Sequence, residues 1–195
     1  SFRNFYWDVC YLGKRSNKLI YEKNNNQDNL NNIHALSVIV DNQVGALARV
    51  VSMFSARGYN IDSLTVAQVA PDENISRITI VTSGTSMMIE QIKSQLGRLV
   101  PVRKVVDLTE EGPFVSRELI FVKVKCKGEK RLEALRTADI FRAKVVDSTK
   151  QSYIFELTGS SDKLDAFISL MKELGLIELA RTGAVAISRG SNKIN

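Results

Sequence analysis

Between residues 34 and 108 the apolar residues follow a strand and helix order that constrains the fold more than any other feature of this chain. They alternate across 36–40, as in a half-buried strand, and recur every three or four positions across 47–54, as on one face of a helix. Gly58 follows this stripe, at the position where a helix commonly ends. The first two predicted elements are therefore a strand and an amphipathic helix.

The following segment predicts a hairpin, a second helix and a closing strand. Apolar and β-branched residues alternate at 64–66 and 78–80, on both sides of the turn-forming Pro71-Asp72-Glu73-Asn74. A second helical stripe runs over 88–99, and 105–108 is expected to be a strand. The predicted order is β-α-β-β-α-β, which is typical of a ferredoxin-like domain.

The same order begins again after Glu110-Glu111-Gly112-Pro113, which we interpret as a short linker. Further strands are expected at 120–126, 145–146, 153–157 and 177–187, and further helices around Leu132 and Leu135 and at 164–171. We therefore predict an α+β protein of two tandem ferredoxin-like βαββαβ domains. The expected boundaries are 1–33 for a disordered N-terminal extension, 34–109 for the first domain, 110–116 for a linker, 117–190 for the second domain and 191–195 for a tail.

Composition limits the class of protein. Of 195 residues, 44% are hydrophobic and 25% are charged, as in an ordinary globular protein. The net charge of +6 is scattered rather than clustered, so we expect no nucleic-acid partner. No apolar run approaches the roughly 20 residues that span a bilayer, so we expect no membrane association. Cys10 and Cys126 lack the spacing of a metal site and are expected to be plain thiols in a reducing compartment.

The segment from Asp41 to Leu47, reading DNQVGAL, places a polar turn directly before the first predicted helix. The N–H groups of the first helical turn have no partner within the helix, and the helix dipole favours negative charge there. The segment therefore predicts a site for a small anion such as a carboxylate or a phosphate.

Other uses of a ferredoxin-like fold leave marks that this sequence lacks. An RNA-binding version carries aromatic residues on its sheet, whereas the comparable strands here read SLTVAQV and SRITIVT. A metal-carrying version has paired cysteines before its first helix, and this chain has none there. His34 is the only histidine and has no recognisable catalytic partner, so we predict that it begins a strand and that the chain has no catalytic or metal site.

Several longer segments resemble one known family. DNQVGALARV, FSARGYNIDSLTV, SRITIVT, ELIFVKV, GSSDKLDAFI and ELARTGAVAISRG are similar to segments of the small regulatory subunit of acetolactate synthase (acetohydroxyacid synthase), over about residues 34–189. The resemblance implies that the first domain is an ACT domain, which binds an amino acid where its first strand meets its first helix.

The resemblance also implies a function. The chain would be a non-catalytic subunit that activates the large catalytic subunit of acetolactate synthase and confers feedback inhibition by valine in branched-chain amino-acid biosynthesis. The partner would use thiamine diphosphate, Mg²⁺ and FAD, and this chain would carry no cofactor. The location implied is a bacterial-type cytoplasm or the plastid stroma.

In the resembled family, valine lies between the ACT domains of a homodimer with two-fold symmetry. The residues implied to contact it here are Asn42, Gly45, Ala46, Leu47, Asn60, Ile61 and Ala67. The N–H groups around Gly45 would receive the ligand carboxylate, and Asn60 and Ile61 would reach across from the neighbouring subunit. Val44 departs from the family pattern, in which that position is small or proline, so the choice among valine, leucine and isoleucine stays open.

One alternative is a free-standing ACT-domain sensor of amino acids that regulates transcription or another enzyme. The second domain argues against it, because it adds a surface without repeating the Asn-x-x-Gly turn.

Overall fold

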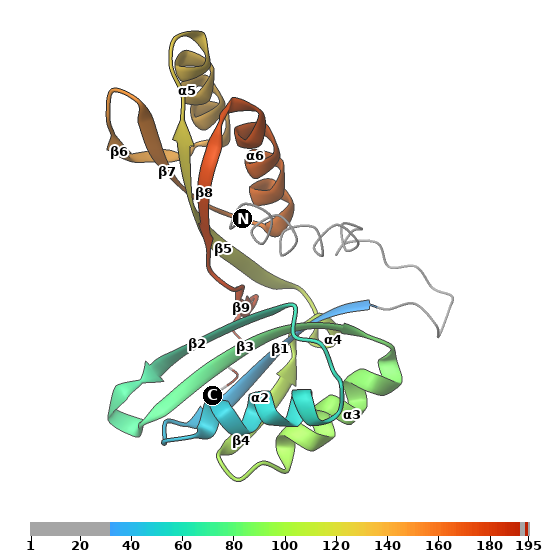
Figure 1. The fold of residues 1–195 in the computed structure, drawn as a ribbon. Helices are drawn as coiled ribbons and strands as arrows, with labels where there is room; N and C mark the ends of the chain where they lie inside the picture. Colours follow the sequence, from blue (N-terminus) through green and yellow to red (C-terminus); the bar gives the residue numbers. More distant parts are fainter. Residues whose placement is uncertain (1–31, 192–193, 195) are drawn as a thin grey trace.

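The computed structural model describes residues 32–191 and 194, which form two α+β units (Figure 1). The first unit contains β1 (Asn32–Asp41), α2 (Ala46–Ala56), β2 (Ser63–Ala70), the 3-10 turn η2 (Pro71–Glu73), β3 (Ile75–Gly84), α3 (Ser86–Gly97) and β4 (Val102–Asp107). A short helix, α4 (Leu108–Glu111), leads to β5 (Phe114–Lys125), α5 (Glu129–Phe141), β6 (Lys144–Ser148), β7 (Ser152–Gly159), α6 (Ser161–Leu174), β8 (Leu176–Arg181) and β9 (Val185–Ser188). The expected extension 1–33 lies outside the described residues except for its last two, which are part of β1. Among the helices of the described residues, none is long and apolar enough to cross a bilayer.

The first sheet is antiparallel in the order β2-β3-β1-β4, and α2 and α3 lie on one of its faces (Figure 1). This arrangement confirms the ferredoxin-like fold expected for the first domain. The sheet and the two helices share one apolar core, made of Leu36, Val38, Val40, Ala46, Val50, Met53, Phe54, Ile78, Ile80, Ile89, Ile92 and Leu96.

The stripes that the two helices bury differ in part from those expected. In α2 the buried residues include Ala46 and Met53, whereas Leu47 is 36% exposed. In α3, Ile89 is buried and Met88 only partly so. Helical periodicity gives the spacing of a stripe, but it does not decide which of two adjacent apolar residues points at the sheet.

Strand β1 is buried on both faces, although its sequence indicated a half-buried strand. Its outer residues Ala35 and Ile39 pack in a second apolar layer with residues from other strands and from the end of the chain. The layer consists of Ala35, Ile39, Ile75, Val106, Leu108, Ala186 and Ile194. Ile194, which we expected in a tail, is thus a packed residue, 5% exposed.

The second unit has the sheet order β6-β7-β5-β8, again ferredoxin-like, and β9 pairs with the beginning of β5. Its helix α6 buries Leu164, Phe167, Ile168 and Met171, as predicted from their spacing. Helix α5 confirms the helix expected around Leu132 and Leu135; it packs through Ala134, Ala138 and the partly buried Leu135, and leaves Leu132 59% exposed. Small residues on the buried face let this helix approach its neighbours closely.

The segment 110–116, expected to be a linker, contains the end of α4 and the start of β5. Gly112 provides the turn between them with a φ of 131°, a conformation that other residues rarely adopt. Figure 1 shows β5 running from the first unit into the second. Its residues 114–117 pair with β9, and residues 118–125 pair with β7.

A partly buried ion-pair cluster fixes the N-terminus of α6 to β5 and β8. Arg181 Nε donates to Glu118 at 2.5 Å and its Nη1 donates to Asp165 at 2.6 Å, while the Ser161 hydroxyl also donates to Glu118. Burial by itself would lower the pKa of the Arg181 guanidinium, but the hydrogen bonds and the negative charge of both carboxylates outweigh burial and raise this pKa. Arg181 therefore stays charged and compensates the buried Glu118 carboxylate.

Cys126 is a free thiol at the end of β5, 4% exposed. Burial raises its pKa, and the charge of Arg131 offsets this only in part, so the reactive thiolate is scarce at neutral pH. We expect Cys126 in the native protein to react with iodoacetamide at least about tenfold more slowly than in urea. Peptide mapping by mass spectrometry would measure both rates at this residue, and equal rates would contradict the prediction.

Candidate functional site

The turn between β1 and α2 leaves the start of α2 open to an anion. Gly45 precedes the helix with a φ of 82°, and no side chain of the described residues caps the first helical turn. The Ala46 N–H already donates to the Gln43 carbonyl at 3.1 Å, so Leu47 is the first residue of the helix whose amide is left for a ligand. Only the φ of Gly45 requires a glycine here, because a Cβ at this position would meet open space.

Asn42 lies beside the turn that connects β2 to β3. Its N–H donates to the Asn74 carbonyl at 2.8 Å, and the Asn74 side-chain amide donates back to the Asn42 carbonyl at 3.0 Å. These bonds use only the backbone of Asn42, so its exposed side chain is available to a ligand. The β1–α2 turn is thereby held next to the end of strand β2.

The second group of predicted residues follows α2. Asn60 is exposed and donates from its side chain to Asp62 Oδ1 at 2.6 Å, while its carbonyl accepts from the Thr82 hydroxyl at 2.6 Å. Ile61 is half-buried and packs against the core of the first unit. The segment is therefore fixed to the start of β2.

Within one chain these two groups do not form a common pocket. The β1–α2 turn precedes α2 and the 60–61 segment follows it, so about 16 Å of helix separates them. Ala67 is exposed near the middle of β2. The structure thus places four of the predicted residues, Asn42, Gly45, Ala46 and Leu47, at or before the start of α2, with Ala46 buried in the core. Asn60 and Ile61 lie after the end of α2, and Ala67 lies on the edge strand β2.

That edge is apolar. The order β2-β3-β1-β4 puts β2 at the margin of the sheet, with no further strand beside it in the described residues. Val66 is 44% exposed, Val69 is 45% exposed, and Val44 at the tip of the β1–α2 turn is fully exposed. An exposed, apolar edge strand favours pairing with another strand.

A hollow of about 500 Å³ lies elsewhere, between α3, β4 and α4, and none of the predicted residues lines it. Its walls carry charges of both signs, including Lys93, Arg103 and Glu111.

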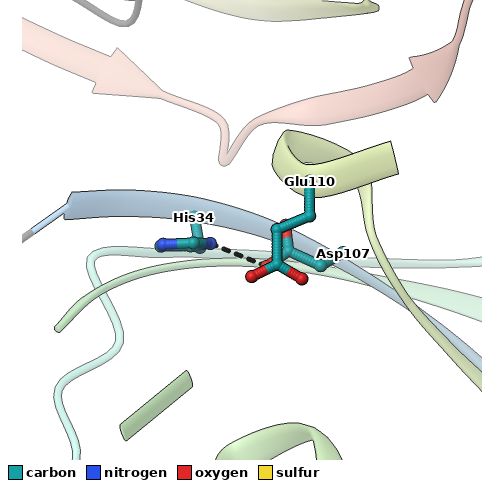
Figure 2. A group of neighbouring side chains, drawn as sticks. All are labelled: His34, Asp107 and Glu110. Atoms are coloured by element: carbon teal, nitrogen blue, oxygen red, sulfur yellow. Dashed lines mark hydrogen bonds and ion pairs between the residues drawn. The ribbon is translucent and has the colours of Figure 1, made fainter. Parts of the chain in front are cut away.

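His34 has a partner that the sequence analysis missed (Figure 2). Its Nδ1 lies 2.7 Å from Asp107 Oδ2, and both side chains are buried. Asp107 also caps α4 by accepting from the Thr109 N–H at 2.9 Å, and the Thr109 hydroxyl accepts from the Ala35 N–H at 3.0 Å. Asp107 at the start of the helix, followed three residues later by Glu110, is a capping pattern, and this pattern could have identified Asp107 as the N-cap from the sequence. No sequence pattern links Asp107 to His34, which lies 73 positions away in the chain.

Glu110 also lies near this pair, within 4.8 Å of both ligand atoms, and all three side-chain types bind divalent cations. Both carboxylates already have partners, however. Asp107 accepts from two groups, and Glu110 lies 2.6 Å from Lys93 Nζ. Burial would lower the pKa of Lys93, yet Glu110 and Glu90 outweigh burial and raise it. We therefore interpret the group as a polar junction that ties α4 to β1.

Both units match known protein families. A model described as an AHAS small subunit-like ACT domain matches residues 36–104, and a model described as the small subunit of acetolactate synthase matches residues 117–190. The first of these matches spans the turn and the strand that carry the predicted residues.

Curated relatives agree along most of the chain. The probable acetolactate synthase small subunit of Archaeoglobus fulgidus is 46% identical over 160 residues, which are 82% of this chain and 99% of that protein. The acetolactate synthase small subunit of Haemophilus influenzae is 48% identical over 82% of this chain and 97% of its own length. The isozyme 3 small subunit of Escherichia coli is 45% identical over 80% of this chain and 94% of its own.

A solved structure is also similar. The crystal structure of an acetolactate synthase small subunit from Thermotoga maritima has 36% sequence identity and a TM-score of 0.74, and the match covers 83% of this chain and 99% of that one. The likeness therefore extends through both α+β units.

Proposed function

Because this chain belongs to the family of acetolactate synthase small subunits, we propose that it is a regulatory subunit that activates a catalytic large subunit and makes it sensitive to valine. In this proposal the chain has no catalytic site of its own. Thiamine diphosphate, Mg²⁺ and FAD belong to the partner, and the pair acts in branched-chain amino-acid biosynthesis. A bacterial-type cytoplasm or the plastid stroma is the proposed location.

One observation carries the effector part of the proposal, namely the uncapped start of α2 behind Gly45. A helix start without a side-chain acceptor offers N–H groups and a positive dipole end to a carboxylate. The neighbouring Asn42 side chain and the exposed Val44 and Leu47 supply polar and apolar groups beside it. An amino acid with a short aliphatic side chain fits these contacts.

We further propose that two chains complete the site. If two β2 edges pair antiparallel across a two-fold axis, the start of one β2 lies beside the end of the other. Asn60 and Ile61 precede the start of β2, and Asn42 is bonded to Asn74 near its end. The pairing would therefore bring the two groups of predicted residues together twice per dimer, with Ala67 between them.

The test is the rate of acetolactate formation by a matching catalytic subunit, with and without this chain and with and without valine. Stimulation that valine reverses supports the proposal. A folded chain that neither stimulates a proper partner nor responds to valine would overturn it and favour a free-standing amino-acid sensor.

Asn42→Ala tests the placement of the effector. We expect stimulation to persist while the valine concentration for half-inhibition rises at least about tenfold, since a hydrogen bond to a charged ligand group is worth about 1.5–3 kcal/mol. Gln43→Ala is the matched control, because Gln43 is exposed in the same turn. An unchanged valine response in Asn42→Ala would remove Asn42 from the site.

A further inference from the structure

The turn between β8 and β9, residues 182–184, connects the second unit to strand β2 of the first. Thr182 is held by β5, because its N–H donates to the Leu119 carbonyl at 3.0 Å and its hydroxyl accepts from the Leu119 N–H at 3.0 Å. Two residues later, the buried Ala184 donates its N–H to the Ser63 hydroxyl at 2.8 Å. Three consecutive residues therefore span from one sheet to the other.

Gly183, at the centre of this turn, lies directly against the backbone of β2. A Cβ at this position would fall 2.5 Å from the Leu64 carbonyl oxygen and nearer still to the Thr65 hydroxyl. The residue is not among those with positive φ, so close approach rather than backbone conformation requires a glycine. Any movement of β2 at residues 63–65 must therefore move this turn as well.

The contacted part of β2 adjoins the predicted effector segment. Only Asp62 separates Ile61 from Ser63, and its carboxylate accepts from the Asn60 amide and, at 2.8 Å, from the Ser83 hydroxyl. These bonds leave little freedom between the effector segment and the start of β2. A displacement of Asn60 or Ile61 is thus passed to Ser63 over a short, hydrogen-bonded path.

The two connections between the units differ in character. The apolar layer around Ile39, Leu108 and Ala186 is tightly packed and resists change. At the turn, by contrast, the buried Thr65 hydroxyl has no hydrogen-bond partner among the described residues. A rearrangement that gave this hydroxyl a partner would recover part of the free energy of the contacts it broke. Rearrangement of the turn should therefore cost less free energy than rearrangement of the apolar layer.

We propose that the β8–β9 turn at Gly183 couples effector occupancy at Asn60 and Ile61 to the second unit. This proposal rests on the proposed function, since it assumes that valine contacts that segment and that the catalytic subunit contacts the second unit. Valine binding shifts the start of β2, and the β8–β9 turn moves with it. Strands β5 and β8, which hold this turn, then transmit the displacement to the second sheet. In this arrangement the residues that bind valine are different from the residues that transmit the change to the second unit.

The experiment measures the valine dissociation constant of the full chain alone and bound to the catalytic subunit, and valine inhibition of the complex. Coupling is reciprocal, so the catalytic subunit should change the wild-type dissociation constant, typically 5- to 150-fold. We expect Gly183→Ala and Ser63→Ala, each folded, to bind valine within about threefold of wild type when alone. In both variants the valine dissociation constant of the free chain and that of the complex should become nearly equal. Inhibition of the complex at saturating valine should weaken.

Gly97→Ala is the control, because a Cβ at Gly97 meets nothing within 4 Å, and it should behave as wild type. Ser63→Ala keeps the proposal testable should Gly183→Ala fail to fold, since it removes only the hydrogen bond to Ala184. Unchanged coupling in a folded variant would overturn the turn's role and leave the proposed function intact. Lost valine binding by the free variant would also overturn it, because the turn would then shape the binding site itself. A wild-type complex without any valine response would overturn both.

Discussion

Val66→Glu is expected to separate the proposed dimer and abolish the valine response. Val66 lies near the middle of β2, so antiparallel pairing about a two-fold axis would set the two introduced carboxylates close together. Like charges facing each other at an interface cost several kcal/mol, which would weaken the dimer at least about 100-fold. Because each effector site draws residues from both chains, the monomer would bind valine poorly.

Sedimentation velocity at micromolar concentration would measure the dimer, and acetolactate formation with valine would measure the response. Ile140→Glu is the control, since Ile140 is 78% exposed on α5 of the second unit rather than on the first sheet, and it should leave both properties unchanged. A Val66→Glu chain that stays dimeric and valine-sensitive would show that the two chains meet through another surface.

The spacing of hydrophobic residues was sufficient to predict the two ferredoxin-like domains, because most long elements carry a regular apolar pattern on at least one buried side. The strand expected over 177–187 is in fact two strands, β8 and β9, and the break at 182–184 was not predicted, since β9 has only four residues and buries only Ala186 fully among them. Helix α4 has a single turn, too short for a stripe, although its capping pattern is local and readable. Short elements of this kind are defined by what they pack against, which a local pattern does not contain.

Strand β1 shows the same limit at the level of packing. Its inward residues alternate as a half-buried strand should, yet its outer residues Ala35, Ser37 and Ile39 are buried as well. Their cover comes from Ala186 and Ile194, about 150 positions later in the chain. Periodicity identifies which residues share a face, but it does not report that a distant segment covers the opposite one.

Part of the candidate site was predictable from local sequence, and part was not. The turn at Gly45 was predictable, because its conformation and the open helix start arise within a few residues. The roles of Asn60, Ile61 and Ala67 came from family resemblance, and in one chain they lie apart from that turn. The bond between His34 and Asp107 joins the two ends of the first unit, so only the folded topology brings the residues together.

Asp107→Ala is expected to destabilise the protein by about 3 kcal/mol. The change leaves the buried His34 ring without its acceptor and removes the cap from the Thr109 N–H, and a buried polar group left unsatisfied costs about 1–3 kcal/mol while a lost cap costs about 1. Asp41→Ala is the matched control, because the Asp41–Arg103 ion pair is solvent-exposed and such pairs contribute about 0–1 kcal/mol. Urea unfolding followed by circular dichroism would compare the two free energies of unfolding. Equal losses would mean that the buried bond contributes no more than the surface pair, and the polar junction would then have no special part in holding α4 to β1.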